Sequence, residues 1–115
     1  MDHPLMDSYL KALSNEKRRR IVELLLHEPL SFKELMDRTG MPQSTLADHL
    51  EALQRSALVY NYVDPKKGNR YRSYYKLSDL GEKFVTTLYS FFFPPRETEL
   101  VYLTPKERII KNTYY

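Results

Sequence analysis

The chain has 115 residues, a length that favours one folded domain, because two separate cores would each bury too little apolar surface to offset chain entropy. Hydrophobic residues make up 42% and charged residues 29%, which excludes a disordered polyelectrolyte. No apolar run approaches the roughly 18 to 20 residues that span a bilayer, and residues 1–4 lack the layout of a signal peptide. We therefore expect a cytoplasmic protein without a membrane partner.

The sequence contains no cysteine, which removes disulfides, thiolate metal ligands and cysteine nucleophiles together. Its three histidines, His3, His27 and His49, are not spaced as a ligand pair. It has no glycine-rich phosphate loop and no nucleophile with a paired base. We therefore expect no metal site, no cofactor and no enzymatic activity.

Two helices are predicted at the start of the chain. Asp7 can cap a short first helix, and Asn15 suits the N-cap of a second helix over residues 16–27, which ends before Pro29. We interpret the basic run at 17–20 as a solvated face, with Arg19 paired to Glu23, although a nucleic-acid patch is the alternative. The apolar positions of the first helix are Met6, Leu10 and Leu13.

A helix-turn-helix is predicted next. Ser31 and Glu34 form a capping box at the start of a helix that reaches Thr39, and Gly40 supplies the left-handed residue that ends it. An amphipathic helix over residues 43–55 follows after a very short turn, which is the spacing of a helix-turn-helix. The apolar side of the second helix carries Leu46, Leu50 and Leu53.

Residues 58–63 and 71–77 are rich in aromatic and branched side chains and predict a β-hairpin with a turn at 64–69. Five cations and one acid fall within residues 64–76, which is a larger local excess than the net charge of +3 for the whole chain. A basic stripe of this kind suits phosphate binding, and a solvated hairpin tip would have the same composition. The hairpin tyrosines are expected to pack across the strands: Tyr60, Tyr62, Tyr71, Tyr74 and Tyr75.

A last helix is predicted from Leu80 to about Phe92, capped by Ser78 or Asp79 and ended by the prolines that follow. It carries more apolar surface than one side of a helix on a small domain can bury, which predicts a homodimer. The alternative is that residues 100–110 fold back over this surface. The residues assigned to the dimer interface are Leu80, Phe84, Val85, Leu88, Tyr89 and Phe92.

The order of four helices, a hairpin and a helix predicts a mainly α fold with a small β-hairpin, the winged helix-turn-helix. We assign residues 1–93 to this DNA-binding domain, including its dimerisation helix. Residues 94–115 are expected to form a C-terminal extension, which packs on the same domain or on the partner subunit. A second capping box at 104–107 predicts a short helix there.

The sequence resembles the ArsR-type transcriptional regulators of prokaryotes over about residues 8–90. Residues 13–22 resemble the second-helix signature of that family, 43–50 resemble its recognition helix, and Arg70 with 75–77 resembles its second wing strand. The resemblance implies a homodimeric repressor on a palindromic operator in double-stranded DNA. It also implies recognition helices in adjacent major grooves and wings on the flanking backbone or minor groove.

Two positions depart from the family pattern. The founding members sense metal through cysteines on the third helix, and residues 31–37 contain none; other members use Asp and His on the last helix, which has no histidine here. Metal sensing therefore does not carry over. The second departure is Asp48, where the family commonly places Lys or Arg.

The DNA-binding candidates fall on the 43–55 helix and the wing. The glutamine at the helix start can bond an adenine edge, and the two hydroxyls after it can bond phosphates or bases, although all three could equally be capping residues. Asp48 could accept a hydrogen bond from cytosine N4, and His49 can bond within the domain or to a phosphate. The full set is Gln43, Ser44, Thr45, Asp48, His49, Lys66, Lys67, Arg70 and Arg72.

The acidic exposed face of the 43–55 helix favours a second class of function, a winged-helix module that binds another protein. Asp48 and Glu51 outnumber Arg55 on that helix, which is unfavourable for approach to phosphate. Duplex binding that weakens as salt is raised would separate the two functions.

Overall fold

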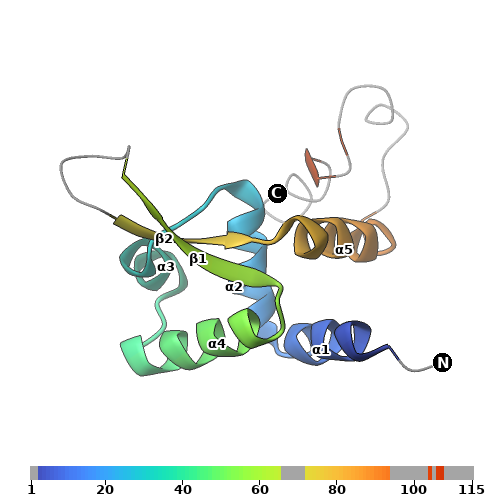
Figure 1. Cartoon of the computed structure of the whole chain (residues 1–115), viewed down its shortest axis with the longest axis horizontal. Coiled ribbons are helices and arrows are strands. Elements are labelled where there is room, and N and C mark those ends of the chain that lie inside the picture. The colour runs from blue at the N-terminus through green and yellow to red at the C-terminus, as the bar shows by residue number, and fades with distance from the viewer. Residues whose placement is uncertain (1–2, 66–71, 94–103, 105, 108–115) are drawn as a thin grey trace.

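The computed structural model describes residues 3–65, 72–93, 104, 106 and 107. Five helices and one antiparallel hairpin make up this part of the chain, which confirms the mainly helical winged helix-turn-helix predicted above (Figure 1). The elements are α1 (Pro4–Leu13), α2 (Glu16–His27), α3 (Phe32–Thr39), α4 (Gln43–Arg55), β1 (Val59–Asp64), β2 (Arg72–Leu77) and α5 (Asp79–Ser90).

The helix starts and stops of α2 and α3 follow from local chemistry. The Asn15 side chain accepts hydrogen bonds from the amides of Lys17 and Arg18 and so caps α2. The Ser31 hydroxyl accepts from the Glu34 amide while the Glu34 carboxylate accepts from the Ser31 amide. Gly40 ends α3 with a φ of 69°, which confirms the predicted left-handed stop.

Helix α1 differs from its prediction at its start and in its buried face. It begins at Pro4, and His3 rather than Asp7 is the N-cap, because the His3 ring accepts a hydrogen bond from the Met6 amide at 3.3 Å. The interior face carries Tyr9, whose ring lies 5.1 Å from that of Phe84 in α5. The predicted inward residues Met6 and Leu10 are instead 44% and 47% exposed.

Helix α2 is the central element of the domain. It packs against α1, α3, α4 and β2, and Figure 1 shows it in the middle of the molecule, with α3 on one side and α1 and α5 on the other. Fully buried aliphatic side chains from all the layers meet around it, as expected for a single core. They are Ile21, Val22, Leu26, Leu30, Leu35, Leu46, Leu50, Leu53, Leu58, Leu77 and Val85.

The hairpin is fixed to the helices at its base. Its register pairs Val59 with Leu77 at the inner end and Asp64 with Arg72 at the outer end. Leu30, between α2 and α3, exchanges two backbone hydrogen bonds with Tyr75 at 3.1 and 2.8 Å. The rings of the cross-strand pair Tyr62 and Tyr74 lie 6.0 Å apart, as the cross-strand prediction requires.

Helix α5 is positioned by Ser78. The Ser78 hydroxyl caps the helix by accepting from the Gly81 amide at 3.0 Å, and it donates to the Ala57 carbonyl at 2.8 Å. The helix starts one residue before the predicted Leu80 and ends at Ser90, before the predicted Phe92. The extension is described only in part: Lys106 Nζ lies 3.0 Å from the Glu82 carboxylate on α5.

Candidate nucleic-acid interface

Helix α4 separates an apolar face from a polar one. Leu46, Leu50 and Leu53 are at most 1% exposed and hold the helix against the core, as predicted. The opposite face is open to solvent, with Thr45 half-buried at its margin. The exposed residues of α4 are Gln43, Ser44, Ala47, Asp48, Glu51, Gln54 and Arg55.

The start of α4 has no side-chain cap. Its N-cap residue is Pro42, and no side-chain hydrogen bond to the first amides is present. The capping alternative for Gln43, Ser44 and Thr45 is therefore not realised, and their side chains are left for other contacts. First-turn N–H groups carry the positive end of the helix dipole and favour an anion.

His49 makes the intradomain hydrogen bond that was one of its two alternatives. Its Nδ1 accepts from Arg18 Nε at 3.3 Å, which joins α4 to α2. Partial burial lowers the pKa of His49, and the nearby charges of Arg18 and Lys17 lower it further. The ring is therefore neutral at pH 7, with Nε2 carrying its proton and Nδ1 used within the domain.

The basic run of α2 is a set of interhelical contacts rather than only a solvated face. Arg19 Nη1 donates to the Leu13 carbonyl at the end of α1 at 2.8 Å. Its charge still acts on Glu23, although the two side chains form no ion pair within contact distance. Arg20 Nη2 donates to the Arg38 carbonyl at 3.2 Å on α3. Together with the bond from Arg18 to His49, these contacts hold α1, α3 and α4 to α2.

The exposed face of α4 is acidic in the structure as in the sequence. Asp48 is exposed, and Glu51 accepts a hydrogen bond from Arg55 at 3.2 Å. Those two side chains are 65% and 71% exposed, so the ion pair contributes little to stability and can rearrange. Arg55 can therefore turn towards a stronger anion.

Most of the predicted wing cations cannot be placed. Lys66, Lys67 and Arg70 lie outside the described residues. Arg72 is exposed at the outer end of β2, paired in register with Asp64. Its positive charge also acts on Glu34 of α3, so the outer end of β2 lies near the start of the helix-turn-helix.

The structure divides the predicted dimer residues into two groups. Val85 and Tyr89 are 0% and 6% exposed, so they belong to the core of the chain itself and have almost no surface for a partner. Val85 belongs to the hydrophobic core cluster. Tyr89 reaches α2, where its hydroxyl donates to the Glu23 carboxylate at 3.1 Å. The others retain accessible surface: Leu80 and Phe92 are exposed, and Phe84 and Leu88 are half-buried.

Sequence reasoning missed one exposed apolar face. Met6 and Leu10 of α1 are exposed, and α1 lies on the same side of the molecule as α5 (Figure 1). The signal in the sequence that could have revealed this face is the second apolar stripe of α1.

In the described ranges, no helix combines the length and apolarity needed to cross a membrane. No group of three or more His, Cys, Asp or Glu side chains suited to a metal ion occurs among the same residues.

A helix-turn-helix with an exposed second helix and a β-hairpin wing defines the winged helix-turn-helix class. The family model described as bacterial regulatory protein, arsR family, matches residues 15–61. The transcriptional activator HlyU of Vibrio cholerae is 46% identical over 50 residues. That match covers 44% of this chain and 46% of HlyU, so it spans about half the length of the curated relative.

Solved structures extend the similarity over most of the domain. Reduced HlyU from Vibrio cholerae has a TM-score of 0.63 at 32% identity, covering 79% of this chain and 90% of that one. HlyU from Vibrio vulnificus has a TM-score of 0.60 at 31% sequence identity, and the match covers 76% of this chain and 86% of that one. The transcriptional repressor BigR from Xylella fastidiosa has a TM-score of 0.63 at 28% sequence identity, and the match covers 76% of this chain and 82% of that one. The chain belongs to the ArsR family of winged helix-turn-helix transcriptional regulators, which are not enzymes.

Proposed function

We propose that the protein is a homodimeric, sequence-specific DNA-binding regulator that represses transcription from a palindromic operator. The observation that carries this proposal is the exposed polar face of α4, with an uncapped N-terminus, in a chain of the ArsR family. A dimer that occupies its operator excludes other proteins from the same DNA, and repression follows. As a regulator of transcription, it acts in the cytoplasm.

Helix α4 enters the major groove with its first turn foremost. Gln43 reads an adenine edge, and Ser44 and Thr45 bond bases or phosphates. Asp48 accepts from a cytosine amino group. His49 contributes through its remaining nitrogen, because Nδ1 is already used by Arg18.

The affinity comes mainly from cations outside α4. The acidic face of that helix repels phosphate, so the wing residues Lys66, Lys67, Arg70 and Arg72 supply the sequence-independent attraction. The wing therefore holds the duplex, and α4 discriminates between sequences.

Dimerisation follows from the surface that α5 leaves uncovered. Leu80, Phe84, Leu88 and Phe92 keep accessible apolar surface, which a second copy covers, with residues 94–115 as an extension beside it. Two α4 helices related by a two-fold axis require two half-sites in inverted orientation, about one helical turn apart.

The decisive experiment selects bound fragments from a random duplex pool and measures their affinity against salt. Four wing cations in each of two subunits give an upper slope of about 7 in log K against log salt. A selected sequence with inverted half-sites and steep salt dependence supports the proposal. Absence of binding at low salt, or binding indifferent to salt, contradicts it and favours the protein-interaction module.

The sign of regulation needs a separate measurement. A promoter reporter with the selected operator should be expressed less when the protein is present. The measurement is needed because the similar proteins differ in sign: HlyU is named a transcriptional activator and BigR a transcriptional repressor. Increased expression would overturn repression and leave operator binding intact.

A further inference from the structure

A basic groove lies where α1, α2 and α4 meet. Its volume is about 230 Å³, and three of its lining side chains are cationic while none is acidic. Lys11 belongs to the last turn of α1 and Arg55 to the last turn of α4, where the negative helix ends favour positive charge. The lining residues are Ser8, Lys11, Ala12, Arg18, Ala52, Arg55 and Ser56.

One of the donors in this groove is held in place, and all three keep N–H groups for a ligand. Arg18 is fixed by the hydrogen bond from its Nε to His49. Within the described part of the chain, neither its terminal nitrogens nor Lys11 Nζ has a hydrogen-bond acceptor or carboxylate partner. Arg55 has only its exposed pairing with Glu51. Three neighbouring cations without a lining carboxylate form a site for an anion.

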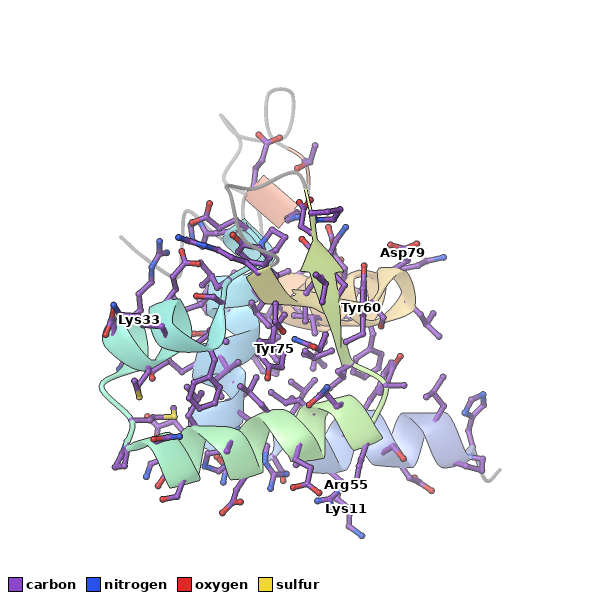
Figure 2. All side chains as sticks on the ribbon, turned by 60° about the vertical axis from the view of Figure 1, so that its left-hand side comes forward. Lys11, Lys33, Arg55, Tyr60, Tyr75 and Asp79 are labelled. Atoms are coloured by element: carbon purple, nitrogen blue, oxygen red, sulfur yellow. The ribbon has the colours of Figure 1, made fainter. Side chains whose placement is uncertain are left out.

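The groove also has a defined place relative to α4 and α5. Figure 2 shows Lys11 and Arg55 side by side below the C-terminal end of α4. In Figure 1, that end of α4 points towards α1, on the side of the molecule where α5 lies. If α5 forms the dimer axis, the groove lies between the recognition helix and that axis, and the wing lies on the outer side.

We propose that Lys11, Arg18 and Arg55 bind DNA backbone phosphates in the central segment of the operator, between the two half-sites. This inference rests on the proposed function. When two recognition helices occupy successive major grooves, the minor groove between them faces the dimer axis and presents its phosphates there. These contacts offset the repulsion from Asp48 and Glu51, and they fix the position of α4 without reading sequence.

The test compares Lys11→Ala with Lys83→Ala, a matched removal of an exposed lysine on α5 outside the groove. Loss of one phosphate contact per subunit should lower the salt slope by about 2 for the dimer, equally on operator and random duplex. Lys83→Ala should match wild type. Arg55→Gln should repeat the effect of Lys11→Ala, and Arg55→Lys should restore most of the slope.

Neutral methylphosphonate linkages locate the contact on the DNA. Placed at the operator centre, they should weaken wild type more than Lys11→Ala, because that variant has already lost one of its three central cations. Placed at the outer ends, they should weaken both proteins alike. Light scattering and urea unfolding of each variant should show an unchanged dimer and fold.

The outcomes separate this inference from the proposed function. If wild type binds duplex DNA in a salt-dependent way but Lys11→Ala behaves like Lys83→Ala, the groove does not bind phosphate. Indifference of wild type to central neutral linkages would overturn the inference in the same way. If wild type does not bind duplex DNA at all, both proposals fall.

Discussion

Arg18 of α2 donates from Nε to Nδ1 of His49 on α4 across 3.3 Å, a contact between residues 31 positions apart in the chain. It needs a neutral imidazole, because a protonated ring has no acceptor and would repel the guanidinium. This hydrogen bond between α2 and α4 therefore depends on the protonation state of His49.

The first prediction is a pH dependence of stability centred on His49. The pKa of His49 is lowered from 6.5 in the folded state, so the unfolded chain binds this proton more readily, and the free energy of unfolding falls as pH drops below 6.5. His49→Asn keeps an acceptor and removes the titration. Urea unfolding between pH 7.5 and 5 should show a shallower decline in this variant, and an identical decline would refute the role of His49.

The second prediction concerns Gly40 and Gly81, which exclude a side chain for different reasons: backbone conformation at Gly40 and close packing at Gly81. Gly40→Ala should destabilise by about 1–2 kcal/mol, because φ is 69° although a Cβ there meets nothing within 4 Å. Gly40→Asn should be milder, since Asn tolerates this region. Gly81→Ala should cost about 1–3 kcal/mol through overpacking, because its Cβ would lie 2.7 Å from the Leu58 carbonyl oxygen. Equal effects of Ala and Asn at residue 40 would contradict the backbone argument.

The third prediction concerns the bond between Tyr89 and Glu23. Burial raises the pKa of Glu23 from 4.5, opposed by the hydrogen bond from Tyr89 and by the charges of Arg19 and Arg20. Tyr89→Phe keeps the ring but should destabilise by about 1 kcal/mol at pH 7 and raise that pKa further.

The sign of this effect can be checked by pH. A raised pKa means that protonated Glu23 is favoured in the folded state, and this stabilisation is lost as pH rises through the folded pKa. The hydrogen bond from Tyr89 favours the charged carboxylate, so the difference in unfolding free energy between wild type and Tyr89→Phe should shrink as pH falls through the folded pKa of Glu23, which lies above 4.5. Glu23→Gln should remove the pH dependence, and a constant difference at all pH values would contradict it.

The fourth prediction concerns Asp48. Asp48→Lys replaces an exposed negative charge on α4 with a positive one and should raise affinity for random duplex while steepening its salt dependence. Asp79→Lys makes the same charge change on α5 and should have a smaller effect. Titration of both variants against a random duplex at two salt concentrations measures this, and equal effects would mean that α4 does not face the DNA.

The fifth prediction concerns the dimer. Phe92→Asp alters a side chain that is 73% exposed, so the fold should persist while the dimer dissociates and operator affinity collapses. Val85→Asp should unfold the chain instead, because Val85 is fully buried. Light scattering without DNA checks the first outcome, and a wild-type monomer at micromolar concentration would overturn the dimer before any variant is made.

The sequence by itself determined the features that depend on residues a few positions apart. The capping box of Ser31 and Glu34, the left-handed stop at Gly40 and the apolar side of α4 all appear where the pattern predicts them. A cap or a helical stripe involves neighbours within one or two turns, so the local sequence contains all the partners. The same reasoning located the polar face of α4.

Only the tertiary structure decided between faces and partners that were locally equivalent. Helix α1 has two apolar stripes, and the contact of Tyr9 with Phe84 of α5 selects the buried one. Arg19 had a local carboxylate within reach but bonds to the Leu13 carbonyl. The basic groove has the same origin, because its three cations come from three helices that only packing around a shared core brings together.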